Sequence, residues 1–278
     1  MRKEIMLKDK VIIITGAAGG IGSTAARLFS EKGARVVLTD IREKPLELCT
    51  SALVAAGGDC RAETLDVTDP ESWSALIENT LKHYGRIDIL VNNAGVVHPG
   101  ATESIAFEKV RQQIFVNLMG TINGCRAVLP HFKKQGTGKI VNVASLGGIV
   151  PMPGEAVYSA TKAAIREYTF SLIAELRKTP IGVTVVCPDS VDTPQLAYEL
   201  EHDEAVMSFI GEPLHPEKVA KAILRAVKTK KSEILVPAGM GVVCRIGMAW
   251  PKIYFLVLPI LEKTGAKTIQ KRRRKNKA

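Results

Sequence analysis

The sequence predicts an α/β protein: a doubly wound parallel sheet of seven strands with helices on both faces. Two observations predict this class. Seven short runs rich in β-branched residues alternate with longer stretches of helical periodicity, and a glycine-rich turn follows the first run. Strands that alternate with helices form parallel sheets. Each crossover helix returns the chain to the end of the sheet where the preceding strand began, so the next strand runs in the same direction.

The elements follow one another over the first 240 residues. The expected strands are residues 11–15, 35–39, 61–65, 87–91, 139–143, 183–186 and 233–236. The expected helices are residues 20–32, 44–57, 70–83, 103–134, 157–178 and 216–229. One long connection, residues 189–215, leaves the carboxyl end of a strand, where ligands bind in open α/β sheets. We interpret it as a lid.

The composition fits a large globular domain. The chain has 278 residues, 46% hydrophobic and 24% charged, which excludes disordered, collagen-like and disulfide-framework proteins. Its five scattered cysteines have no CxxC spacing, so we expect neither a metal site nor a disulfide scaffold. Such cysteine usage indicates a reducing, intracellular and cytoplasmic location.

A glycine-rich turn lies between the first expected strand and the first expected helix. Gly16, Gly20 and Gly22 permit a tight turn and a close approach of backbone N–H groups to an anion. The positive end of the helix dipole favours the same anion. An ordinary strand–helix turn is the alternative, but this position favours binding of a dinucleotide pyrophosphate.

Asp40 ends the second expected strand, 24 residues after Gly16. A carboxylate there accepts hydrogen bonds from both hydroxyls of an adenosine ribose and repels a 2′-phosphate. Arg42 is the one nearby counter-argument, since no basic side chain precedes Gly20. The sequence therefore favours NAD(H) over NADP(H); the alternative is an aspartate that only ends a strand.

Three motifs resemble the short-chain dehydrogenase/reductase family in its one-domain form. They are Thr15-Gly-Ala-Ala-Gly-Gly-Ile-Gly22, Asn92-Asn-Ala-Gly95 and Tyr158-Ser-Ala-Thr-Lys162, and the similarity runs from about residue 7 to about residue 240. The resemblance implies a Rossmann-type fold and a nicotinamide-dependent oxidoreductase. It also implies a homodimer or homotetramer built on helices 103–134 and 157–178. Residues 1–240, including the lid 189–215, are thus expected to form an NAD-binding catalytic domain.

The resemblance assigns roles to residues of this sequence. The catalytic residues that it implies are Asn117, Ser145, Tyr158 and Lys162. The cofactor-binding residues that it implies are Gly16, Gly20, Ile21, Gly22, Asp40, Asp66, Val67, Asn93, Ala94, Gly95, Tyr158, Lys162, Val191 and Thr193. The chain departs from the family at Pro188-Asp189, where the family has Pro-Gly, so we expect a reshaped loop beside the nicotinamide.

The pair Tyr158 and Lys162 also makes sense from its chemistry. At positions i and i+4 of an expected helix, the two side chains share one face. An ammonium group there favours the phenolate and lowers a tyrosine pKa that is ordinarily near 10. Ser145 can hold a substrate oxygen near the tyrosine, which then exchanges a proton with it. A bare Tyr-x-x-x-Lys is more often an exposed helical pair, and only the other motifs weaken that alternative here.

The substrate pocket is expected between residues 146–154, the turn 96–100 and the lid. Its candidate residues are Val97, His98, Met152 and Leu196. The mostly apolar walls, with no arginine cluster, predict a lipophilic secondary alcohol or its ketone as substrate. His98 is the polar exception, and a solvated loop histidine is the commoner explanation for such a residue.

Residues 241–278 lie outside the resemblance. Of the net charge of +10, residues 262–278 carry +7, and an apolar part precedes this basic tail. That order suits a peripheral membrane contact through residues 242–278, although no stretch reaches the ~20 apolar residues of a spanning helix. The alternative is an apolar part that closes the pocket or an oligomer interface, with a disordered tail. Nucleic acid is not expected as a partner, because the rest of the chain is nearly neutral.

Three functions follow from these observations. The leading hypothesis is an NAD(H)-dependent dehydrogenase for a lipophilic secondary alcohol. A 3-oxoacyl or other carbonyl reductase would run in the reverse direction, which Asp40 mildly opposes because it disfavours NADPH. A non-catalytic nucleotide-binding sensor or membrane-associated scaffold is opposed by the intact set of expected catalytic residues.

Overall fold

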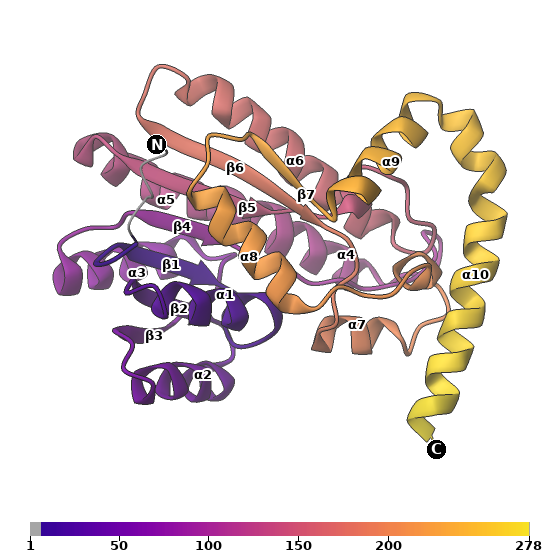
Figure 1. Ribbon diagram of the computed structural model, residues 1–278, viewed down its shortest axis with the longest axis horizontal. Coiled ribbons are helices and arrows are strands. Elements are labelled where there is room, and N and C mark those ends of the chain that lie inside the picture. The colour runs from indigo at the N-terminus through magenta and orange to yellow at the C-terminus, as the bar shows by residue number, and fades with distance from the viewer. Residues whose placement is uncertain (1–6, 278) are drawn as a thin grey trace.

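The computed structural model describes the backbone of residues 7–277 and the side chains of residues 7–275. Seven parallel strands form one sheet in the order β3-β2-β1-β4-β5-β6-β7 (Figure 1), which confirms the predicted doubly wound α/β fold. The strands are β1 Val11–Thr15, β2 Arg35–Asp40, β3 Cys60–Thr64, β4 Ile89–Asn92, β5 Gly138–Val143, β6 Ile181–Pro188 and β7 Glu233–Val236.

Helices cover both faces of the sheet. They are α1 Gly20–Ser30, α2 Glu43–Ala55, α3 Pro70–Tyr84, α4 Phe107–Gln113, α5 Gly120–Gln135, α6 Ala156–Leu176, α7 Pro194–Glu199, α8 Pro216–Val227, α9 Ala238–Ala249 and α10 Pro251–Lys277. Three short segments complete the set: a π-helix η1 Ile114–Met119 and two 3₁₀ turns, η2 Leu146–Gly148 and η3 Val206–Phe209.

Alternating side chains of β1 fill two separate hydrophobic layers. Ile12 and Ile14 pack against α1, α2 and α8 on one face, and Val11 and Ile13 pack against α3, α5 and α6 on the other. All four are fully buried. This accounts for the continuous apolar run of β1, because a strand covered on both faces needs no polar side.

Several boundaries differ by one to four residues from the expected ones, and two differences are larger. The expected helix 103–134 begins only at Phe107 and consists of α4, η1 and α5 in succession. The expected boundary after residue 240 falls inside α9, and the basic tail continues as helix α10 to Lys277. The lid also has structure of its own, since it contains α7 and η3.

The topology opens a crevice at the carboxyl ends of β1 and β4. Strand order reverses between these two neighbours, so their crossovers leave in opposite directions. The glycine-rich turn follows β1, and the Asn92–Gly95 motif follows β4. The fold thereby places two motifs that are 70 residues apart on either side of one crevice.

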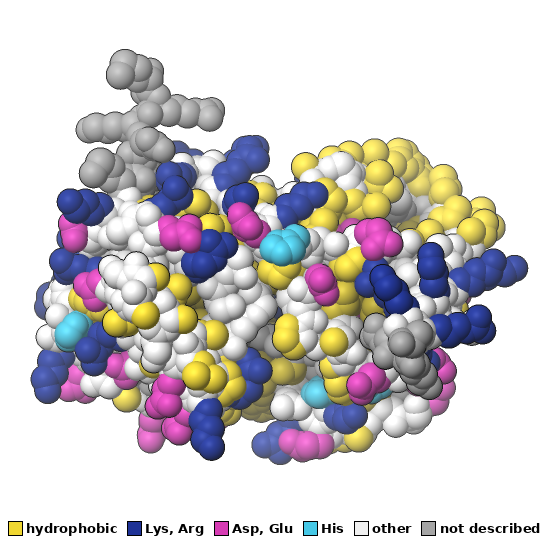
Figure 2. All heavy atoms as spheres, turned by 60° about the horizontal axis from the view of Figure 1, so that its bottom comes forward, with side chains coloured by type: hydrophobic (Ala, Val, Ile, Leu, Met, Phe, Trp, Pro, Cys, Tyr) yellow, Lys and Arg dark blue, Asp and Glu magenta, His cyan; other side chains and the backbone are white. Residues whose placement is uncertain are grey.

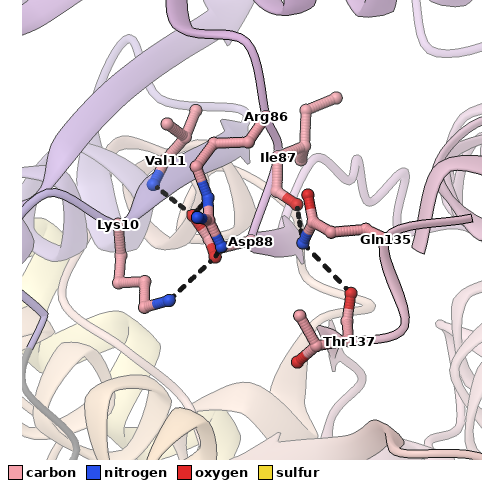
Figure 3. A network of polar contacts seen from close by, with 7 residues as sticks. All are labelled: Lys10, Val11, Arg86, Ile87, Asp88, Gln135 and Thr137. Atoms are coloured by element: carbon pink, nitrogen blue, oxygen red, sulfur yellow. Dashed lines mark hydrogen bonds and ion pairs between the residues drawn. The ribbon is translucent and has the colours of Figure 1, made fainter.

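At the other end of the sheet, Asp88 fastens β1 to β4 (Figure 3). Its carboxylate accepts hydrogen bonds from Val11 N at 3.0 Å, Lys10 Nζ at 3.0 Å and Arg86 Nε at 2.9 Å. Gln135, at the end of α5, donates to two backbone carbonyls beside this network. Burial alone would raise the pKa of Asp88, but the hydrogen bonds from Arg86, Val11 and Lys10 outweigh it and hold the pKa below its usual value.

Replacing Asp88 by alanine is expected to lower the free energy of unfolding by about 2–3 kcal/mol, because the buried Val11 N–H loses its acceptor. Urea unfolding measures the difference. Since the folded-state pKa is depressed, the stabilisation is present above about pH 4 and is lost as the pH falls through that pKa. The control is Glu31→Ala, which breaks only an exposed pair with Arg27 and should cost less than about 1 kcal/mol. Equal losses would contradict the assignment.

Candidate active site

The turn after β1 has a backbone that requires glycine at three positions. Gly16 and Gly20 have φ of +66° and +56°, a region that favours glycine. A Cβ atom on Gly22 would lie 2.2 Å from the Gly16 carbonyl oxygen, so no larger residue fits there. Ile21 is partly buried against the core. Since α1 begins at Gly20, its positive end faces this cradle, which fits the pyrophosphate of a dinucleotide.

The motif after β4 is fastened to this turn. The Asn93 side chain donates to the carbonyl oxygens of Thr15 at 2.9 Å and Gly16 at 3.2 Å. Thr15 Oγ1 accepts from the backbone N–H groups of Asn93 and Ala94, both at 3.0 Å. These bonds fix the two walls of the crevice relative to each other, which is a positioning role for both motifs.

Asp40 ends β2 beside the turn and is 7% exposed. Its carboxylate accepts from Ala18 N at 3.1 Å and from the Arg42 guanidinium, whose Nε lies 3.1 Å away. The acid is therefore present at the expected position. The Arg42 guanidinium, however, already takes up part of the hydrogen-bonding capacity of the Asp40 carboxylate. In the sequence, Arg42 was only a counter-argument to a preference for NAD(H).

The residues expected at the adenine follow β3. Asp66 Oδ1 accepts from the backbone and the hydroxyl of Thr68, both at 2.8 Å. The Val67 side chain is buried, and its carbonyl accepts from Trp73 Nε1 at 3.0 Å. The buried Trp73 thus anchors this loop at the edge of the crevice.

Tyr158 and Lys162 lie on one face of α6, as their spacing predicts. Lys162 Nζ lies 5.6 Å from the centroid of the Tyr158 ring and donates to Val143 O at 3.2 Å. The Ser145 and Gln195 side chains lie close enough to the Tyr158 hydroxyl to lower its pKa by hydrogen bonding. Burial lowers the pKa of Lys162 to about 8. The fold therefore brings Ser145, Tyr158 and Lys162 into one cluster.

Asn117 lies in the π-helical segment η1 and is fully buried. Its Oδ1 accepts from Val96 N at 2.7 Å, and its Nδ2 donates to Val96 O at 2.9 Å and Thr161 Oγ1 at 3.0 Å. A Cβ atom on Gly95 would lie 3.3 Å from both Asn117 Oδ1 and Lys162 Nζ. The two side chains therefore meet at the Gly95 backbone. A π-bulge at this point is typical of functional sites.

Two buried carboxyl groups on the lid side of Tyr158 were not foreseen. Glu155 precedes α6 and is 2% exposed, and Glu199 ends α7 and is 5% exposed. Ser208 Oγ donates to Glu155 Oε2 at 3.3 Å, and Gln195 Nε2 donates to Glu199 Oε1 at 3.3 Å. Burial raises the pKa of both groups, and the charge of Glu199 raises that of Glu155 further.

These acids change the electrostatics expected at Tyr158. Burial raises the pKa of Tyr158, and the charges of Glu199 and Glu155 raise it further, while hydrogen bonds to Ser145 and Gln195 oppose the rise. In the protein alone the net direction is thus upward. This is the opposite of what the Tyr158–Lys162 spacing predicted, because the spacing says nothing about the burial of the hydroxyl or about the two acids beside it.

Glu199→Gln is expected to move the pH profile of alcohol oxidation to lower pH. The change removes a negative charge beside Tyr158, lowers the pKa of its hydroxyl, and so makes the basic form available at lower pH. Measurement of kcat/KM against pH tests this. The control is Glu201→Gln, because Glu201 is exposed just beyond α7. If both variants keep the wild-type profile, the buried acids do not act on Tyr158.

The loop after β6 keeps an ordinary backbone despite its aspartate. Among the residues described, Asp9 is the one non-glycine residue with positive φ, so Asp189 needs no glycine-like conformation. Burial raises the pKa of the Asp189 carboxyl. Further on, Val191 is buried, and the Thr193 methyl group lies 3.2 Å from the position of a Cβ on Gly20. Thr193 thus faces the glycine turn across the crevice.

Of the four expected pocket residues, two are buried and two are partly exposed. Val97 and Leu196 are buried, and Leu196 packs with Phe209 of the lid. Met152 is partly exposed, and its sulfur lies against Gly147. The fourth, His98, bridges from the turn after β4 to the lid.

His98 is not a freely solvated side chain. Its Nδ1 lies 3.2 Å from the hydroxyl of Tyr198 on α7, and its Nε2 lies 2.7 Å from Gln112 Oε1. The neutral tautomer with its proton on Nε2 satisfies both contacts. His98 therefore links the turn to the lid, which neither the catalytic nor the solvated interpretation of the sequence anticipated.

Comparison with known proteins places this site in a class. The family profile described as short chain dehydrogenase matches residues 10–204. The 2,5-dichloro-2,5-cyclohexadiene-1,4-diol dehydrogenase LinX of Sphingobium indicum is 34% identical over 214 residues, 75% of this chain and 86% of that protein. The putative oxidoreductase SadH of Mycobacterium tuberculosis is 32% identical over 238 residues, 82% of this chain and 86% of that protein.

Solved structures agree with this assignment. A short chain dehydrogenase/reductase from Burkholderia phymatum in complex with NAD has a TM-score of 0.82 and 26% identity, and the alignment covers 90% of this chain and 96% of that one. An actinorhodin polyketide ketoreductase with NADPH has a TM-score of 0.78 and 32% identity, with coverage of 84% and 97%. The chain belongs to the short-chain dehydrogenase/reductase family. It is an oxidoreductase of the class that acts on CH–OH groups, with a fold that binds NAD(P).

Proposed function

We propose that this chain is an NAD(H)-dependent dehydrogenase that interconverts a lipophilic secondary alcohol and its ketone, with Tyr158 as the general acid/base. The observation that carries the proposal is the cluster of Ser145, Tyr158 and Lys162 at the crevice where the glycine turn meets the Asn92–Gly95 motif. Asn117 adds to it by holding the backbone at Val96.

Each residue has a role that its contacts support. When bound, the nicotinamide cofactor takes up or supplies the hydride, and its oxidised ring adds a positive charge that favours the phenolate. Ser145 orients the substrate oxygen, and Tyr158 removes its proton during oxidation or returns it during reduction. Lys162, charged in most molecules at neutral pH, lies with its Nζ 5.6 Å from the centroid of the Tyr158 ring, and a positive charge beside a phenol favours its phenolate.

The preference for NAD(H) rests on Asp40. Its buried carboxylate suits ribose hydroxyls and repels a 2′-phosphate. Asp40→Ser is expected to lower the ratio of kcat/KM for NADH over NADPH by on the order of a hundredfold, since it removes the repulsion and releases Arg42. Glu43→Gln, an exposed acid nearby, is the control. A wild-type enzyme that prefers NADPH would contradict the proposal.

The substrate class rests on the walls of the expected pocket. Val97, Leu196 and Phe209 supply apolar surface, and no arginine stands among the candidate lining residues. The name of the relative LinX describes a dehydrogenase of a chlorinated cyclic diol, a secondary alcohol with little polar surface beyond its hydroxyls. Both facts favour a lipophilic alcohol over a phosphorylated or carboxylated one.

The test is nicotinamide turnover on matched lipophilic alcohols and ketones, with NAD(H) and NADP(H) in parallel. Turnover of the alcohols with NAD⁺ is the expected result. Efficient reduction of 3-oxoacyl thioesters or other ketones with NADPH, without oxidation of alcohols, would favour the carbonyl reductase instead. Tight NADH binding without turnover on the whole panel would favour the non-catalytic sensor.

Self-association and peripheral membrane contact belong to the same proposal. Phe107, Ile114 and Phe115 are exposed on the α4–η1 stretch, one of the two helices expected at a homodimer or homotetramer interface. Light scattering on a sizing column measures the mass, and a monomer would contradict the oligomer. The membrane contact through residues 242–278 rests on a different surface, formed by α9 and α10.

A further inference from the structure

Helices α9 and α10 form an arm, residues 238–275, with a continuous apolar outer side. Ten of the sixteen exposed large hydrophobic side chains of the described chain lie on it. They are Met240, Val242, Val243, Ile246, Trp250, Ile253, Phe255, Leu256, Val257 and Ile260. Figure 2 shows hydrophobic side chains gathered at this end of the molecule, with Lys and Arg side chains beside them. Apolar surface concentrated in this way marks an interaction site.

The charge around this surface favours one partner. Glu262 is the single acidic residue from position 234 to the C-terminus. Lys252, Lys263, Lys267 and Lys271 are exposed along α10, which continues into the basic run 272–275. Apolar side chains with a tryptophan, on a helix whose charged side chains are almost all cations, match a bilayer that contains anionic lipids. Within residues 7–277 no helix is long and apolar enough to cross a membrane, so the geometry is that of a helix lying at the surface.

The arm is held rigidly against the catalytic domain. Arg245 of α9 forms an ion pair with the buried Glu233 of β7, which also accepts from Arg166 Nε of α6 at 2.6 Å. Gly241 lies so close to Leu235 that a Cβ there would clash at 2.4 Å. The apolar surface is therefore preformed.

The inner side of α10 touches both expected walls of the substrate pocket. Tyr254, 7% exposed, donates from its hydroxyl to Pro151 O at 2.6 Å, in the stretch expected to line the pocket. About four turns further on, Ile269 is buried among lid residues that include Leu196 and Phe209. A Cβ on Gly265 would meet the Val206 carbonyl oxygen at 2.0 Å, so helix and lid are in direct backbone contact.

Arginines at the end of α10 fix the lid from the same side. Arg273 Nε donates to Leu200 O at 2.7 Å, and its guanidinium pairs with Asp203 at 2.6 Å. Arg272 pairs with Glu212 at 2.9 Å and lies over the Phe209 ring. Helix α10 thus carries part of the outward apolar surface in its first half and the contacts with the lid in its second.

We propose that the arm docks on an anionic phospholipid bilayer and so sets the mouth of the pocket, between residues 151–154 and the lid, at the lipid surface. The substrate then enters from the bilayer. The docking stands on the arm alone, whereas the entry of substrate rests on the proposed function.

Vesicle binding by the full chain tests the docking. Co-sedimentation with phosphatidylcholine vesicles, with and without phosphatidylserine, should show binding that requires the anionic lipid. Of the two tryptophans, Trp73 is 1% exposed and Trp250 is 61% exposed, so a blue shift of emission and quenching by brominated lipid report on the arm. Leu256→Glu should weaken binding roughly tenfold or more. Leu48→Glu on α2 is the matched control, since the exposures are 77% and 73%.

Three results would overturn the docking. They are equal vesicle binding of the two variants, no binding by the wild type, and a dimer that Leu256→Glu alone converts to a monomer. The last would make a second copy the partner. For substrate entry, Leu256→Glu should lower kcat/KM for a lipophilic alcohol delivered in vesicles but not in detergent micelles. Equal loss in both would overturn it. Absence of turnover in either form would count against the proposed function, while vesicle binding would still decide the docking.

Discussion

Replacing Tyr158 by phenylalanine is expected to lower kcat for alcohol oxidation by roughly 10²–10⁴-fold. The change removes a single oxygen, that of the hydroxyl beside the Ser145 and Gln195 side chains, and keeps the ring beside Lys162. Because the glycine turn and Asp40 are untouched, NADH affinity should stay near the wild-type value. Steady-state turnover and a fluorescence titration with NADH measure the two effects separately.

A second tyrosine on α6 provides the control. Tyr168 is also partly buried, and burial raises its pKa as it does that of Tyr158, but its hydroxyl contacts Cys125 in the core. Tyr168→Phe should therefore keep turnover and cost at most some stability. If Tyr158→Phe turned over at the wild-type rate, Tyr158 would not be the acid/base.

The fold could be predicted because its signal is local and repeated. Strand β7 begins and ends at the predicted residues, and so does β1, since each is a short β-branched run bounded by turn residues. The three motifs fall at strand ends or on one helix face. The alternation of strands and helices implies parallel strands, whose carboxyl ends lie at one end of the sheet. The observed strand order then makes β1 and β4 neighbours.

The break in the expected helix 103–134 could not be predicted from periodicity. The π-helical segment η1 adds one residue to a helical turn. The spacing of apolar residues in the sequence does not reveal this extra residue. Within η1, Asn117 makes three hydrogen bonds to groups outside this helix, at Val96 and Thr161. Those partners come from tertiary structure, which a local pattern does not contain.

The buried acids are the clearest feature that the sequence does not reveal. Glu155 and Glu199 are 44 residues apart, and each alone looks like an ordinary surface residue. They meet only because α7 and η3 fold back over the start of α6, where Ser208 reaches Glu155. A residue whose environment is made by a long connection carries no local signal, and here that environment reverses the expected electrostatics of Tyr158.

The apolar and basic parts of the C-terminal segment are evident in the sequence, but its helical structure was not predicted. The sequence allowed a disordered basic tail, yet α10 runs from Pro251 to Lys277 with Pro259 inside it. Arg272 and Arg273 are held by the lid, so part of the basic run serves packing as well as charge. These contacts fasten the end of α10 to the lid.

Replacing Lys162 by methionine is expected to lower kcat/KM by roughly 10²-fold or more. Lys162 is 4% exposed, and its Nζ lies where it can act on Tyr158 and on a group seated at Gly95. Without the ammonium beside the ring, the phenolate loses a neighbouring positive charge, so we expect the pKa of Tyr158 to rise and less phenolate to form. The alkaline shift of the kcat/KM profile distinguishes this effect from a loss of folded protein.

Lys139 supplies a matched control for that experiment. It too is largely buried, and burial likewise lowers its pKa to about 8. It lies in β5 away from the crevice, however, and donates to Thr184 Oγ1 at 2.8 Å and Thr229 O at 3.1 Å. Lys139→Met should therefore reduce stability and leave kcat/KM per folded molecule and its pH profile intact. Equal losses of kcat/KM in the two variants would mean that Lys162 acts through stability alone, because the variants differ only in which site loses its charge.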